Sequence, residues 1–146
     1  MRRLVLAYLF VCGLLVLPRF IFASIVINEI AWMGSLPKAG DTASAAAGNE
    51  WMELANIGGE TADLTGWILE AQDGTPRIEL SGTIAAGGFF LLERTNDDTI
   101  PSVPADQLYT GAMSNSGEFL SLRNAAGATV DSVDASTGWP AGDNTT

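Results

Sequence analysis

The chain contains no histidine, and its only cysteine, Cys12, lies in an apolar run close to the N-terminus. Both residue types are therefore missing after residue 23, which excludes Ser–His–Asp and Cys–His catalysis and the zinc sites built from these ligands. The only lysine, Lys38, follows Pro37, so the Gly-Lys pair of a phosphate-binding Walker loop is missing too. These absences predict a domain that is not an enzyme and that carries no cofactor.

Basic residues are also scarce. The chain has seven Lys and Arg against seventeen Asp and Glu, and three of the basic residues are Arg2, Arg3 and Arg19. From residue 24 onward four basic residues remain against all seventeen acidic ones, a net charge of −13. Nucleic acids and anionic membrane surfaces attract proteins chiefly through Lys and Arg, so we expect neither as a partner. Solubility, cation association or a basic partner fits this charge better.

Residues 1–23 have the pattern of a secretory signal peptide. Arg2 and Arg3 precede an apolar run over residues 4–17, and the segment ends in Ala23. The run is shorter than the ~20 apolar residues that a membrane-spanning helix needs. We therefore predict cleavage after Ala23 and export to the cell surface or the medium. An uncleaved N-terminal anchor is the alternative.

The remaining residues, 24–146, match the size of one domain. Short β-type runs alternate with Gly, Asn, Asp and Pro about every ten residues, which is typical of an all-β sandwich or barrel, and no segment has a sustained helical period. The long stretches over residues 34–49 and 94–106 read as surface loops. The predicted strands cover residues 25–31, 50–56, 67–71, 77–80, 89–93, 118–123 and 128–134.

Several blocks of this sequence resemble the lamin tail domain. The most specific is DLTGW at residues 63–67, and the other blocks follow in the family's order. They are INEIAW at 27–32, EWMEL at 50–54, LSLRN at 120–124, VDSV at 130–133 and WPAGDN at 139–144. The resemblance covers about residues 25–144 and implies an immunoglobulin-like β-sandwich.

The resemblance also implies a kind of function. In nuclear lamins the domain is a non-catalytic interaction module, and the family has no shared catalytic residues to carry over. Similar bacterial domains occur in exported proteins, often beside nuclease, other hydrolase or surface-associated domains. Bacterial members typically continue into a Ser-Met-Glu-Arg-like strand, whereas this chain stops at Thr146. By this resemblance two alternatives stay open: a stand-alone module, or a fragment that continues into a last strand and further domains.

The tryptophans are the first group of candidate binding residues. Trp32, Trp51, Trp67 and Trp139 could form a stacking platform, but large aromatics more often pack in the core. We assign Trp67 to the core and keep Trp32, which borders the first long loop, as a candidate for a binding surface.

The carboxylates are the second group. Glu50 and Glu53 are three residues apart in a predicted strand, so they point to opposite faces and cannot form a catalytic pair. Asp97, Asp98 and Asp106 in the second long loop are candidates for a binding surface. Together with Asp131 and Asp134 they could surround Ca²⁺, but no EF-hand-type loop is present and acidic loops are usually solvated.

We therefore predict an exported, non-catalytic domain that serves attachment, spacing or partner binding at the cell surface or outside the cell. The partner is expected to be a protein or a cell-surface polymer, bound by loops at residues 33–49 and 94–108. The alternative is an accessory domain of an exported hydrolase or nuclease whose catalytic part lies beyond residue 146.

Overall fold

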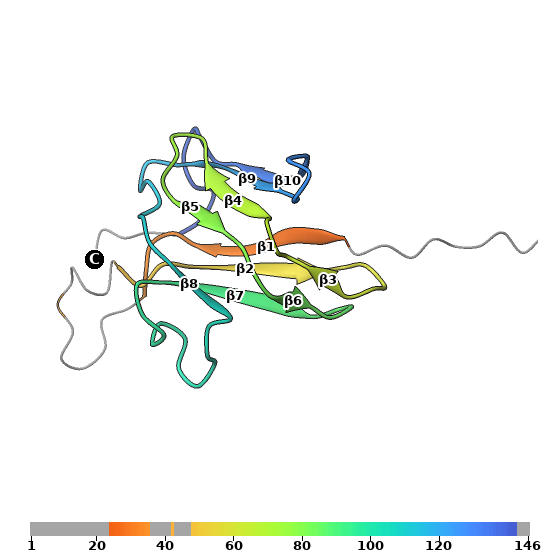
Figure 1. Ribbon diagram of the computed structural model, residues 1–146. Coiled ribbons are helices and arrows are strands. Elements are labelled where there is room, and N and C mark those ends of the chain that lie inside the picture. Colours follow the sequence, from red (N-terminus) through yellow and green to blue (C-terminus); the bar gives the residue numbers. More distant parts are fainter. Residues whose placement is uncertain (1–23, 36–41, 43–47, 143–146) are drawn as a thin grey trace, which may run out of the picture.

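The computed structural model describes residues 24–35, 42 and 48–142, and this part of the chain is built from ten β-strands without a helix (Figure 1). The predicted signal peptide and most of the first long loop lie outside the described residues. Within the described part, no helix is long and apolar enough to cross a membrane. The strands are β1 (Ile25–Ala31), β2 (Trp51–Asn56), β3 (Ala62–Asp63), β4 (Ile68–Ala71), β5 (Arg77–Glu79), β6 (Thr83–Ile84), β7 (Phe89–Arg94), β8 (Gln107–Tyr109), β9 (Phe119–Arg123) and β10 (Thr129–Asp134).

The strands form two four-stranded sheets and one small two-stranded sheet. The first large sheet has the order β1-β2-β7-β8, the second has the order β10-β9-β4-β5, and β3 pairs with β6. All pairings are antiparallel except that of β7 with β8, which is parallel. The prediction of an all-β, immunoglobulin-like sandwich is confirmed.

The core lies between the two large sheets and follows the alternation of the strands. Met52 and Leu54 point inward from β2, and Leu120 and Leu122 point inward from β9; all four side chains are fully buried. Their neighbours Glu53 and Ser121 are only partly buried, because successive side chains in a strand point to opposite faces. The prediction that Leu120 and Leu122 share one face is confirmed.

Strand β7 is buried on both of its faces over most of its length, as its apolar sequence predicts. Phe90 and Leu92 lie opposite Leu54 and Met52, so they face the core, and Leu91 and Glu93 must face outward. Both outward residues are nevertheless buried, at 6% and 0% exposure. The connection from β7 to the parallel strand β8 covers them.

Single side chains join the two large sheets at their open sides. On one side, the Ile27 N–H of β1 donates to Asp131 Oδ2 of β10 at 2.7 Å. On the other, Gln107 of β8 accepts from the Ser81 N–H and donates to the Glu79 carbonyl of β5. Edge strands expose unpaired backbone groups, and these contacts cover part of each edge.

Three parts of the fold differ from the sequence prediction. Strands β3, β6 and β8 were not predicted, because two or three residues are too short to show a period. Strand β4 begins at Ile68, so Trp67 precedes it. The Trp67 side chain packs against the core but stays partly exposed.

We expect Leu122→Ala to lower the free energy of unfolding by about 2–5 kcal/mol, because it removes a fully buried side chain and leaves a cavity. Val130→Ala on the neighbouring strand is the control, since Val130 is 42% exposed and should change stability by no more than about 0.5 kcal/mol. Urea unfolding measures both. Equal midpoints for the two variants would contradict the core described here.

Candidate functional site

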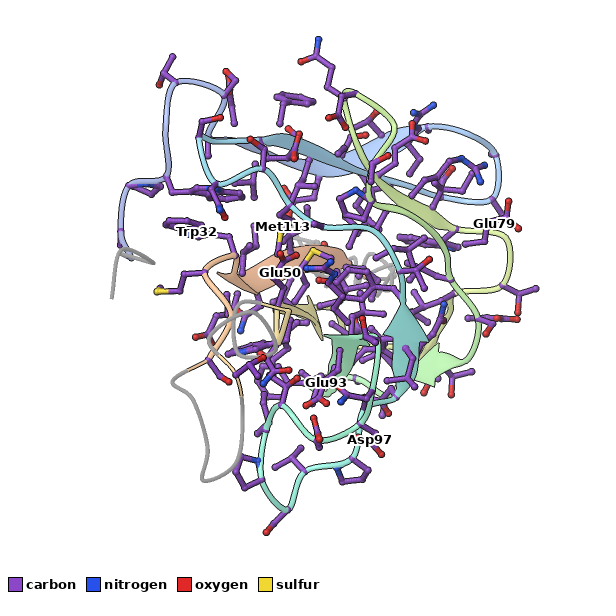
Figure 2. All side chains as sticks on the ribbon, turned by 90° about the vertical axis from the view of Figure 1, so that its left-hand side faces the viewer. Trp32, Glu50, Glu79, Glu93, Asp97 and Met113 are labelled. Carbon is purple, nitrogen blue, oxygen red and sulfur yellow. The ribbon has the colours of Figure 1, made fainter. Side chains whose placement is uncertain are left out.

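Three buried glutamates lie at one end of the sandwich, and each accepts hydrogen bonds from the backbone of a loop. Glu50, Glu93 and Glu118 are 3%, 0% and 6% exposed. We call this end the loop end; it comprises residues 32–35, 49–50, 95–106 and 110–118. Figure 2 looks onto it and labels Glu50 and Glu93 among the residues found there. A buried carboxylate is costly unless it is hydrogen-bonded, so these contacts fix the loops to the sheets.

Glu93 holds the loop over residues 95–106. Its Oε2 accepts from the Thr99 N–H at 3.0 Å and its Oε1 from the Ile100 N–H at 2.8 Å. Hydrogen bonds to an ionised acceptor are stronger than those between neutral groups. Both carboxylate oxygens of this buried side chain are therefore used to hold the loop.

Two aspartates hold the same loop through further hydrogen bonds to backbone N–H groups. Asp97 Oδ1 accepts from the Ala105 N–H, and Asp106 Oδ2 accepts from the Leu91 N–H of β7, both at 2.7 Å. Thr95 and Ser102 adopt positive φ angles of 75° and 68°, which cost non-glycine residues about 1–3 kcal/mol each. The carboxylate contacts offset this strain and hold the loop in one conformation.

Glu50 connects a second loop to the sheets. Its Oε1 pairs with Arg94 Nη1 at 2.9 Å, and its Oε2 accepts from the Met113 N–H at 2.8 Å. Burial raises the pKa of Glu50, and the Met113 hydrogen bond and the Arg94 charge oppose this rise. Burial and the nearby Glu50 charge also raise the pKa of Tyr109, whose hydroxyl has no partner among the described residues.

The candidate Trp32 is 7% exposed and stacks on Trp139. The two ring centroids are 5.7 Å apart and the planes differ by 6°. Trp32 Nε1 donates to the Ala141 carbonyl and Trp139 Nε1 to the Ser114 carbonyl, both at 2.8 Å. One face of Trp32 is therefore covered, and Trp139 is the more accessible ring of the pair.

The candidates of the sequence do not meet at one point. Asp97, Asp98 and Asp106 belong to a single loop, whereas Trp32 lies apart from Asp97 on the same end (Figure 2). Across residues 24–35, 42 and 48–142, no three Asp, Glu, His or Cys side chains are grouped so that they could hold a metal ion. Glu50 and Glu53 also point apart, since Glu53 accepts from Asn28 instead.

Sequence reasoning missed Glu93 and Glu118, which hold loops in the structure. Glu93 ends the run FFLLE, which was predicted to be buried on both faces. A charge at the end of such a run signals a buried carboxylate that needs partners. Glu118 precedes the apolar alternation of β9, and its Oε2 accepts from the Ser114 N–H at 3.0 Å.

We expect Glu93→Ala to release the loop over residues 95–106. The variant leaves the Thr99 and Ile100 N–H groups without an acceptor, at a cost of about 1–3 kcal/mol for each that stays buried. Urea unfolding gives the loss of stability, and amide exchange should accelerate at these two positions. Glu60→Ala in an exposed turn at the other end is the control and should change neither quantity. Unchanged exchange in Glu93→Ala would contradict the tethering role.

We expect the stability contributed by Glu50 to fall as the pH rises. Because its folded-state pKa lies above the usual 4.5, the folded protein binds this proton more tightly than the unfolded chain does. The contribution is fully present below the unfolded value and is lost as the pH rises through the folded value. The free energy of unfolding of Glu50→Gln minus that of the wild type should therefore increase between about pH 4 and about pH 7. A constant difference would contradict this.

Comparison with known proteins agrees with the architecture. The model of the lamin tail domain family matches residues 22–137, which is most of the chain. No curated protein matches this chain. The family is one of non-catalytic immunoglobulin-like domains. The chain therefore belongs to the lamin tail domain family.

Proposed function

We propose that this protein is an exported, non-catalytic domain that attaches to a protein or a polymer at the cell surface or outside the cell, and that the loop end binds this partner. The observation that carries the proposal is that buried glutamates fix the loops of this end. A loop that is already ordered loses less conformational entropy on binding than a mobile one. Burying carboxylates is costly, so their use to hold these loops in place favours a role of the loops in recognition.

The loop over residues 95–106 offers a surface suited to this role. Asp97, Asp98, Pro101 and Val103 line part of a hollow of about 520 Å³. Val103 is 50% exposed and therefore adds apolar area next to carboxylates. An apolar centre with a polar rim is the usual composition of a protein-binding surface.

The charges support a protein or a neutral polymer over a nucleic acid. Each arginine that the structure describes, Arg77, Arg94 and Arg123, forms an ion pair with a glutamate. These pairs leave no basic stripe of the kind that contacts phosphates. Export is supported by the leader pattern of residues 1–23.

Retention on cells tests the proposal. We expect the expressed protein to be found outside the cytoplasm and the purified protein to be retained by the surface of the cells that export it. Retention should fall several-fold in the double variant Asp97→Ala, Val103→Ala, which changes the centre of an interface. Glu60→Ala at the opposite end should be retained like the wild type. Cytoplasmic location would overturn the export, and equal retention of both variants would overturn the role of the loop end.

A further inference from the structure

A groove of about 230 Å³ opens beside strand β1, between the two large sheets. Ile27, Ile30 and Trp32 line one wall, and Val133, Trp139 and Pro140 line the other. Ile27, Ile30 and Trp139 pack against the core but are only partly buried. The stacked indoles use their N–H groups within the protein, so the groove presents mainly apolar surface.

The backbone of Ile30 is directed away from the sheet and toward this groove. Asn56 at the end of β2 and Glu50 just before it form backbone hydrogen bonds on the β7 side, so the even-numbered residues of β2 direct their backbone groups toward β7 and the odd-numbered ones toward β1. Glu53 is paired with Glu29 of β1, so the backbone N–H and C=O of Glu29 point toward β2. By alternation, the N–H and C=O of the next residue, Ile30, point outward.

The edge of β1 is open at Ile30. Before the irregularity in the pairing between Ile27 and Glu29, the outward N–H of Ile27 is taken by Asp131. Past it, among the described residues, no backbone or side-chain hydrogen bond reaches Ile30. One donor and one acceptor at the end of a strand thus border an apolar groove, which is the arrangement that lets a sheet accept another strand.

The charge around the groove is acidic. Glu29 is exposed on its rim, Glu53 lies opposite Glu29 on β2, and Asp134 is exposed at the end of β10. None of the described arginines lines the groove, and each is already paired with a glutamate. A second copy of this acidic chain would be repelled here, whereas a basic segment would be attracted.

We propose that the groove binds an extended basic segment of a partner protein, which adds to the free edge of β1 by pairing with Ile30. One or two apolar side chains of the segment enter the groove and contact Val133 and Trp139. Lys or Arg side chains on its other face meet Glu29 and Glu53. The groove shares no lining residue with the hollow formed by Asp97 and Val103, so the two proposals can fail separately.

Peptide binding followed by NMR tests the proposal. The probe is a capped hexapeptide of alternating valine and lysine. We expect it to shift the amide signal of Ile30 and the indole signals of Trp32 and Trp139, and to slow exchange of the Ile30 amide. A valine–glutamate hexapeptide should not bind, because its charge matches that of the rim. A valine–lysine peptide methylated on alternate backbone nitrogens should bind at least about five-fold more weakly, because it loses hydrogen bonds to the edge.

A matched pair of variants tests the charge. Glu29→Gln should weaken binding of the valine–lysine peptide about three-fold or more without changing the fold, since Glu29 is exposed. Glu60→Gln at the opposite end of the sandwich should leave the affinity unchanged. No shift at Ile30 with millimolar peptide, equal binding of the methylated peptide, or equal affinity of the two variants would each overturn the proposal.

Discussion

The need of backbone N–H groups for acceptors governs much of this structure. Sheets satisfy their own backbone, but loops and sheet edges do not, and a buried unpaired N–H is costly. In this protein acidic side chains supply many of the missing acceptors. Glu93 serves two loop residues, Glu50 and Glu118 serve one each, and Asp131 serves the edge of β1. The loop end depends on these hydrogen bonds, and so does the contact between β1 and β10 on one side of the sandwich.

This pattern shows that the acidic residues also have a structural role. A net charge of −13 from residue 24 onward suggests solubility and a preference for basic partners. Several carboxylates, however, are partly or fully occupied by backbone N–H groups inside the fold, among them Glu93, Asp97 and Asp106. Within the part of the chain that the structure describes, Glu50 is the one buried glutamate that pairs with an arginine. The charge available to a partner is therefore concentrated on exposed residues such as Glu29.

The sequence was sufficient to predict the architecture, and the reason is the regular alternation of its strands. Leu120 and Leu122 show a period of two, and the DLTGW block points to the family independently. The site was harder to predict, because its acceptors and donors are far apart in sequence. Met113 follows Glu50 by 63 residues, and Asp131 follows Ile27 by 104. No local pattern encodes such a contact, and Trp32 gave no sign that Trp139 would stack on it.

Strand β1 runs from one end of the sandwich to the other. Strand β1 begins, and strand β2 ends, at the end of the sandwich opposite to the loop end (Figure 1). The seven residues of β1 span roughly 23 Å between these ends, at ~3.3 Å per residue. A partner bound at the loop end or at the open edge near Ile30 would therefore lie up to one strand length away from the end of the domain at which β1 begins.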